Sequence, residues 1–197
     1  MSTATIAEFH DLALRLHPTC AAGPLRAVSV SGALHVGGRI TLDYLLQGEL
    51  LQLSLPPPAR SPQRRDELWR HSCLELFAQR DAAVEYVEFN FSPSGDWAAY
   101  RFASYRRGQS TFAQQPVGIT LHPLGPGQLR IQACAQLSTT AQISAPAVPL
   151  QRWRLGLAAV VEANDGSLGY WALRHAGAKP DFHAADNFDI ALEVALT

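Results

Sequence analysis

Two neighbouring stretches decide the fold, DELWRHSCLELF (residues 66–77) and EYVEFNFSPSGDWAAYRFASY (residues 85–105). In the second stretch, apolar side chains stand at every other position from Val87 to Phe91, and Glu88 and Asn90 stand between them. A period of two places successive side chains on opposite faces of a β-strand. The sequence therefore predicts a strand with one apolar face and one polar face.

A turn and a returning strand follow. Residues 93–96 read PSGD, which supplies the proline, glycine and aspartate that turns prefer. The alternation over residues 97–102 then predicts a second, antiparallel strand. Two registers stay open at this point: one sets Trp97 and Arg101 beside the polar face of the first strand, and the other sets Tyr100 there.

The same signals recur along the chain. Asn164, Asp165 and Gly166 form the strongest hairpin signal, and a Gln47-Gly48 turn followed by alternating leucines over residues 51–55 predicts another hairpin. The first twenty residues and residues 61–68 are the two stretches that we expect to be helical, and residues 138–149 are expected to connect strands as a loop. About ten strands with short turns predict an all-β fold, an antiparallel β-sandwich of jelly-roll or immunoglobulin-like type with one or two short helices.

Composition limits the classes of protein that remain. The 197 residues suit a single domain (1–197, with a core over about 25–195), and the net charge of −1 provides no field that would attract nucleic acid or an anionic membrane. The three cysteines are far apart, so neither a disulfide framework nor a paired-cysteine metal motif is predicted. With no signal-peptide pattern and no long apolar run, we expect a cytoplasmic protein. The oligomeric state is not predicted.

Aromatic and polar residues of the central stretches are the candidates for ligand binding. Trp69 and Trp97 each adjoin a loop or turn, where an indole ring can stack on the apolar face of a sugar ring. Carboxylate, amide and guanidinium groups can then bind the sugar hydroxyls, and the strands offer them in Glu75, Glu88, Asn90 and Arg101. Structural roles as core tryptophans and ion pairs are the competing interpretation.

Two further segments add candidates outside the strands. Tyr105 precedes Arg106-Arg107, and Arg174 and His175 lie in the segment GYWALRHAGAKPDFH (residues 169–183), where glycine and proline predict a loop. The histidine spacings match no metal-binding motif, and no loop has the dense aspartate spacing of a calcium site. No catalytic residue, metal ligand or cofactor is therefore predicted, and haem or calcium is kept as an alternative.

The motifs LWRHSCLELF, YVEFNFSPSGDWAAYRF and YWALRHAGAKPDFH together resemble the bacterial DOMON-like domain family, which is related to the family 9 carbohydrate-binding modules. The resemblance spans most of residues 25–195 and implies a β-sandwich with a non-catalytic role, binding a sugar or, in other branches, haem. Its sugar-binding positions correspond here to Trp69, Trp97, Glu75, Glu88, Asn90 and Arg101. The haem branch commonly uses a methionine ligand, and the only methionine here is Met1.

Three functional hypotheses follow from these residues. The leading one is a non-catalytic module for a sugar or sugar-like compound, phosphorylated sugars included. The second is a haem- or metal-binding domain of the DOMON type. The third is an enzyme that acts on a carbohydrate-related substrate through Glu75 and Glu88, the carboxyl pair that a glycosidase needs, or through His175.

Overall fold

The computed structural model describes residues 4–81, 83–113, 118–137 and 150–195. Its strands are β1 (Thr5–Leu16), β2 (Leu25–His35), β3 (Arg39–Gly48), β4 (Cys73–Arg80), β5 (Tyr86–Phe91), β6 (Trp97–Phe102), β7 (Ser110–Thr111), β8 (Gly118–Gly125), β9 (Gln128–Gln136), β10 (Leu150–Glu162), β11 (Leu168–Ala172) and β12 (Ile190–Ala195). The described helices are short 3₁₀ turns, η1 (Leu50–Gln52), η2 (Leu68–Arg70) and η4 (Ala185–Asn187). No α-helix occurs in these ranges, so the predicted all-β fold is confirmed.

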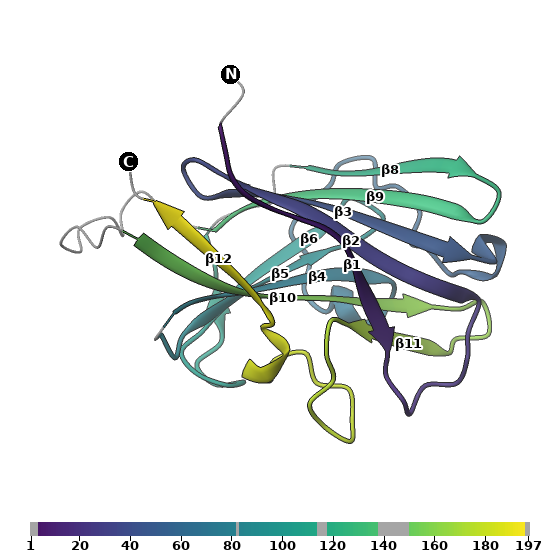
Figure 1. Ribbon diagram of the computed structural model, residues 1–197. Coiled ribbons are helices and arrows are strands. Elements are labelled where there is room, and N and C mark those ends of the chain that lie inside the picture. The colour runs from purple at the N-terminus through teal and green to yellow at the C-terminus, as the bar shows by residue number, and fades with distance from the viewer. Residues whose placement is uncertain (1–3, 82, 114–117, 138–149, 196–197) are drawn as a thin grey trace.

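The strands form two layers that are joined through β1 (Figure 1). One layer has the order β1-β2-β3-β9-β8, and the other has the order β7-β6-β5-β4-β10-β11 with β12 beside β10. Strand β1 pairs with β2 over most of its length, while its last residues, Arg15 and Leu16, pair with β11. The named strand pairs are antiparallel throughout, so one curled sheet folds over itself as a sandwich.

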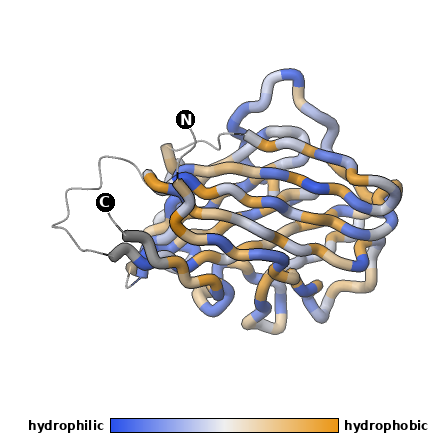
Figure 2. The backbone as a smooth tube through the Cα atoms, turned by 45° about the horizontal axis from the view of Figure 1, so that its top comes forward, coloured by the Kyte–Doolittle hydropathy of each residue, from blue (hydrophilic) through white to orange (hydrophobic). Residues whose placement is uncertain are grey.

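The main core lies between the two layers. Apolar side chains at alternate strand positions point into it, and apolar and polar residues accordingly alternate along many strands in Figure 2. Its largest fully buried side chains include Tyr44, Phe89, Phe91, Ile131 and Leu155. Burial of each such side chain contributes about 1.5–3 kcal/mol, which makes this core the principal source of stability.

The hairpin predicted at residues 164–166 is confirmed. Strands β10 and β11 pair from Ala158↔Ala172 to Glu162↔Leu168, and the turn between them closes with a hydrogen bond from Ser167 N to Asp165 Oδ1. Gly166 has a φ of 83°, a value that glycine adopts without steric cost.

The predicted helix in the first twenty residues is wrong, because these residues form β1. The pairing of β1 with β2 is interrupted between Phe9 and Leu12, where Asp11 takes a left-handed φ of 49°. This bulge adds a residue to one strand, so the apolar side chains on either side of it are three positions apart. That spacing resembles a helical period.

Two other predicted elements are also wrong. Strand β3 is already paired on both edges, with β2 and with β9, so the leucines after Gly48 form η1 instead of a returning strand. Residues 61–67 form no helix and only Leu68 enters η2, because the chain hydrogen-bonds to the start of β6 through Trp97 N to Gln63 O and Arg65 N to Trp97 O. The predicted loop at residues 138–149 lies outside the described residues. Within the described ranges no helix has the length and apolar character needed to cross a membrane.

Candidate functional site

Strands β4, β5 and β6 bury side chains on both of their faces. One face contributes to the core between the layers, and the other points away from it. In the observed register Glu88 lies opposite Tyr100, and Asn90 lies opposite Ala98. The alternative with Tyr100 is therefore the correct one, and Trp97 and Arg101 lie on the opposite face from Glu88.

The outer face of these strands is covered rather than exposed. It carries a second cluster of buried side chains that includes Phe77, Tyr86, Phe102 and, from the segment between β11 and β12, Phe182 and Phe188. The polar face predicted for β5 consequently lies beneath a loop, and its carboxyl and amide groups are removed from water.

A cavity of about 500 Å³ opens between this outer face and the covering loops. Strand residues form its floor, and residues from the β6–β7 and β11–β12 connections form its mouth. It is lined by Trp69, Glu75, Glu88, Tyr100, Phe102, Arg106, Gln109, Val160, Tyr170, Lys179, Pro180, Phe182 and His183.

Glu75 is the most unusual residue of this cavity. The residue is 3% exposed and lines the cavity, yet no hydrogen bond or ion pair joins its carboxyl group to any described residue. Only its backbone oxygen is bonded, by the Tyr44 hydroxyl at 2.9 Å. Burial raises the pKa of Glu75 well above its ordinary value, and the neighbouring Glu88 raises it further. Glu75 thus has unused hydrogen-bonding capacity, and its surroundings favour the protonated form of its carboxyl group.

Glu88 is buried as well, but it has protein partners. Asn90 Nδ2 donates to Glu88 Oε1 at 2.6 Å, and His183 Nε2 lies 3.7 Å from Oε2. Burial raises the pKa of Glu88 to about 7, although Asn90 and Arg106 oppose the shift. Burial also lowers the pKa of His183 to about 4, so His183 is uncharged at neutral pH. Glu88 can therefore exchange a proton near neutrality.

Asp181 connects the two loops at the mouth of the cavity. Its carboxylate accepts hydrogen bonds from the Tyr105 hydroxyl and, at 2.8 Å, from Arg106 Nη2. Its Oδ1 also accepts the backbone N–H of His183. Arg106 has a left-handed φ of 52°, a strained conformation for a residue with a side chain. These bonds hold the guanidinium group of Arg106 at the cavity, close to Lys179.

Trp69 stands at the mouth on η2, with 46% of its surface exposed. The turn begins after Glu67, which has a left-handed φ of 62°, and Glu67 pairs with Arg70 at 2.8 Å. The guanidinium group of Arg70 lies 5.4 Å from the centre of the indole ring. A large aromatic ring is thus held partly open to solvent at the entrance of a cavity.

The structure brings together Trp69, Glu75 and Glu88 among the residues predicted to bind a ligand. Asn90 lies directly behind them and holds Glu88. Tyr105 is one contact away from the cavity, through Asp181.

The other predicted residues lie elsewhere. Trp97 packs against the core between the layers, and Arg101 pairs with Glu85 at 3.5 Å. Arg174 is exposed, and it does not line the cavity. The ring of His175 bonds to the backbone oxygen of Arg15 and lies 6.4 Å from the ring of Phe182.

Several lining residues were not predicted as ligand residues. Tyr100 and Phe102 alternate with Arg101 along β6, and the observed register places both of them on the same face as Glu88. Lys179, Phe182 and His183 lie in the predicted loop segment of residues 169–183, but nothing in their spacing shows that the loop folds over β4 and β5.

The described residues contain no group of three or more His, Cys, Asp or Glu side chains that could hold a metal ion. Each carboxylate considered for calcium already has a protein partner. Asp96 accepts the backbone N–H of Gln63, Glu88 accepts a hydrogen bond from Asn90, and Asp181 accepts one from Arg106. These carboxylates therefore do not assemble a cation site among the described residues.

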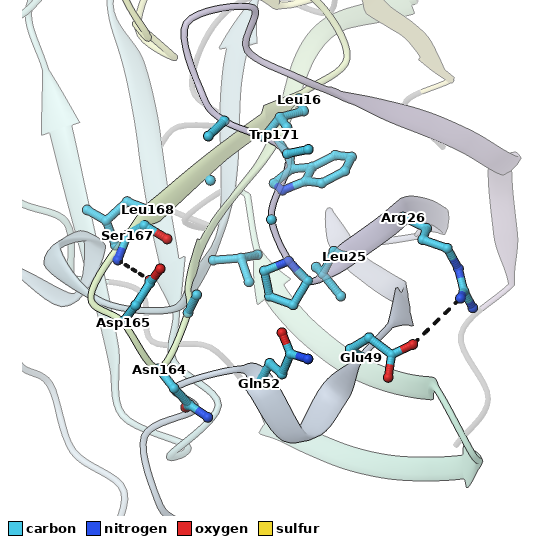
Figure 3. A pocket seen from close by; sticks show the side chains of 17 residues that line it. Leu16, Leu25, Arg26, Glu49, Gln52, Asn164, Asp165, Ser167, Leu168 and Trp171 are labelled. Carbon is cyan, nitrogen blue, oxygen red and sulfur yellow. Dashed lines mark hydrogen bonds and ion pairs between the residues drawn. The ribbon is translucent and has the colours of Figure 1, made fainter.

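A larger cleft of about 640 Å³ lies where the two layers separate, beside the β10–β11 turn (Figure 3). Trp171 and Leu25 contribute to its apolar wall, and Gln52 and Asn164 lie at its edge. Its charged groups are exposed to solvent, and the Arg26–Glu49 ion pair measures 3.8 Å. Because no buried ionisable group lines this cleft, the cavity over β4–β6 is the better candidate site.

Comparisons with known proteins found similar folds among solved structures. No protein-family model matches the chain, and no curated protein matches it. Its structure is similar to that of a candidate carbohydrate-binding protein from Bacteroides uniformis ATCC 8492, with a TM-score of 0.59 and 14% identity over 84% of this chain and 77% of that one. This similarity establishes a shared fold, and the predicted structural resemblance to carbohydrate-binding proteins is confirmed.

Two structures of a family 9 carbohydrate-binding module from Caldicellulosiruptor kristjanssonii also align. The module in complex with glucose has a TM-score of 0.43 and 11% identity over 93% of this chain and 83% of that one. The module in complex with cellotriose has a TM-score of 0.40 and 14% identity over 83% of this chain and 71% of that one.

Proposed function

We propose that this protein is a non-catalytic binding module and that a sugar or sugar-like compound occupies the cavity over β4–β6. The observation that carries this proposal is Glu75, a buried carboxyl group that faces the cavity without a partner among the described residues. A hydroxyl group of a ligand can bond to this carboxyl group, so the site is arranged to favour a hydroxylated guest.

The rest of the lining suits the same ligand. Trp69, Tyr170 and Phe182 offer aromatic surfaces against which the C–H faces of a sugar ring can pack, and Glu88 and Gln109 add hydrogen-bonding groups. The volume of about 500 Å³ lies within the usual size range of small-molecule sites, roughly 300–1,000 Å³. The fold shared with the Bacteroides uniformis protein, described as a candidate for carbohydrate binding, supports this assignment.

Calorimetric titration with a panel of neutral sugars, amino sugars and sugar phosphates tests the proposal. We expect at least one class to bind the wild-type protein, and we expect Trp69→Ala and Glu75→Ala each to weaken that binding about tenfold or more. Leu124→Ala is the matched control for Trp69→Ala, because Leu124 is 44% exposed on β8 and lies outside the cavity. Unchanged affinity in both cavity variants, or no binding across the whole panel, contradicts the proposal.

Hydrolysis of a glycoside is a second candidate function, favoured by the pKa of Glu88. A carboxyl group with a pKa of about 7 can act as a general acid at neutral pH. Glu75 pairs with Asn90 and Glu88 pairs with Phe77, so the two glutamates are diagonal neighbours. Such neighbours lie about 7–8 Å apart, with their Cβ atoms somewhat closer. The test is release of nitrophenol from aryl glycosides. If the wild type releases it and Glu88→Gln does not, the protein is a glycoside hydrolase and the non-catalytic assignment is wrong.

A further inference from the structure

The cavity over β4–β6 combines aromatic rings with carboxyl groups to an unusual degree. Five aromatic side chains besides His183 line it, namely Trp69, Tyr100, Phe102, Tyr170 and Phe182. The faces of such rings carry partial negative charge and attract cations. Carboxylates form their strongest hydrogen bonds with charged N–H donors. Together these are the groups that recognise a protonated amine.

The two carboxyl groups are placed so that a single amine can meet both. Glu75 and Glu88 occupy the same face of adjacent strands in diagonal positions. Diagonal neighbours lie about 7–8 Å apart, with their Cβ atoms somewhat closer, and both side chains line the cavity. An ammonium group carries three N–H donors, whereas a sugar hydroxyl carries one O–H donor. A primary amine can therefore donate to both carboxylates at once, whereas a single hydroxyl group can donate to only one of them.

We propose that the ligand of this cavity carries a protonated primary amine, as an amino sugar does, and that the ammonium group binds between Glu75 and Glu88. The unpartnered, buried carboxyl group of Glu75 is the position at which the ammonium group forms its first bond. This inference rests on the proposed function, because it assigns a chemical class to the ligand of the same cavity.

The basic residues of the cavity lie at its mouth. Arg106 is paired there with Asp181 at 2.8 Å, so its charge is compensated. Lys179 belongs to the exposed part of the β11–β12 connection. An amino sugar therefore binds with its ammonium group on the floor of the cavity and with its hydroxyl groups toward Lys179 and Gln109.

Arg106 is the charged group that opposes the raised pKa of Glu75, whereas several other titratable groups around Glu75 are uncharged at neutral pH. Burial raises the pKa of the Cys73 thiol on β4, of Tyr44 on β3 and of Tyr170 on β11. Burial lowers the pKa of His183 and of His175 in the covering segment. The pKa values of Tyr86 on β5 and Tyr100 on β6 are likewise raised by burial. The charge on the floor of the cavity is thus set by the two glutamates.

Binding of an amine consequently involves proton release. The pKa values of Glu75 and Glu88 are raised because their charged forms are desolvated. A neighbouring ammonium group stabilises those charged forms and lowers both pKa values, so protons leave the protein when the amine binds. A neutral sugar does not provide this stabilisation, and its binding is not coupled to proton release in the same way.

Titration calorimetry with glucose, glucosamine and N-acetylglucosamine tests the inference, because these sugars differ in one substituent: a hydroxyl, an ammonium and an acetamide group. Near pH 6.5 we expect glucosamine to bind about tenfold or more tightly than either neutral sugar, with proton release seen as a dependence of the heat on the ionisation enthalpy of the buffer. Glu75→Gln and Glu88→Gln should each remove most of this preference. Glu8→Gln is the control, since Glu8 is an exposed carboxylate on β1.

The outcomes separate this inference from the proposed function. Glucose or N-acetylglucosamine binding as tightly as glucosamine overturns the inference and leaves a sugar-binding module. Tighter binding of glucose 6-phosphate than of glucosamine overturns it as well, and would place recognition at Lys179 and Arg106. A preference for glucosamine without proton release, measured on the wild-type protein so that folding of a variant plays no part, also overturns the role assigned to the two glutamates. Absence of binding by all of these sugars overturns the inference, and the wider panel then decides the proposed function.

Discussion

Glu88→Gln is expected to change how the stability of this protein depends on pH. Burial raises the pKa of Glu88 from its ordinary 4.5 to about 7. Between these values the folded state holds a proton that the unfolded state has lost. The stability that this proton confers is fully present below about pH 4.5 and is lost as the pH rises through about 7. Glutamine cannot ionise, so the variant does not lose this stability.

The size of the effect follows from the two pKa values. They differ by about 2.5, and each unit corresponds to about 1.4 kcal/mol, so the free energy of unfolding of the variant should rise by roughly 3 kcal/mol relative to the wild type between pH 4.5 and pH 8. His183 acts in the opposite direction. Its pKa is lowered to about 4 by burial, so its contribution is lost as the pH falls from about 6.5 to 4. Because both proteins contain His183, its contribution cancels in the difference between them, which reports on Glu88 together with its effect on the pKa of Glu75.

Urea denaturation followed by circular dichroism, at intervals from pH 4.5 to pH 8, measures this difference. The amide oxygen of the substituted glutamine can still accept the hydrogen bond from Asn90 Nδ2, which spans 2.6 Å in the wild type, so the variant should fold. Glu8→Gln makes the same chemical change at an exposed position and should follow the wild-type curve. The reasoning is refuted if the difference in free energy of unfolding between wild type and Glu88→Gln changes by less than about 1 kcal/mol over this pH range. Linkage to a pKa raised to about 7 requires a larger change.

Two further predictions concern the segment that covers the cavity. Asp181→Ala removes the acceptor of Tyr105 and Arg106; amide hydrogen exchange over residues 103–109 should become faster, while global stability falls by less than about 1 kcal/mol because the ion pair is partly exposed. Unchanged exchange there would show that Asp181 does not hold the loop. Gly156→Ala places a Cβ atom 2.7 Å from Phe188 Cδ1 and should lower stability by about 1–3 kcal/mol in thermal melts, whereas Gly118→Ala, with no atom within 4 Å of its added Cβ, should have little effect. Equal melting temperatures for these two variants would contradict the packing described for Phe188.

Local patterns were sufficient to predict most of the sheet. The alternation through Val87 and Phe91 and the turn at residues 164–166 each depend on neighbours in sequence, and both are found in the structure. The strand β1 was missed because its alternation is interrupted by a bulge at Asp11. A bulge depends on pairing with another strand, and nothing in a single strand's sequence shows that pairing.

The sequence was sufficient to select those site residues whose chemistry stands out from that of their neighbours along the chain. Glu75 and Glu88 stand out as carboxyl groups in otherwise apolar strands, and Trp69 stands out as an indole beside a loop. Trp97 shares the residue chemistry of a ligand-binding indole, but the register of β5 with β6 turns it toward the core between the layers. His183 was not predicted, because its place at the cavity depends on how a long connection packs against a distant strand.

The location of the chain's only lysine affects how any of these experiments is carried out. Amine-reactive dyes, biotin esters and carboxymethyl sensor surfaces react with lysine side chains and with the amino terminus, and here the side chain they reach is Lys179, at the mouth of the candidate site. A preparation coupled in this way would carry a bulky adduct over the entrance and could give a false negative on a glycan array. The same property places any side-chain amine label beside the cavity, at Lys179.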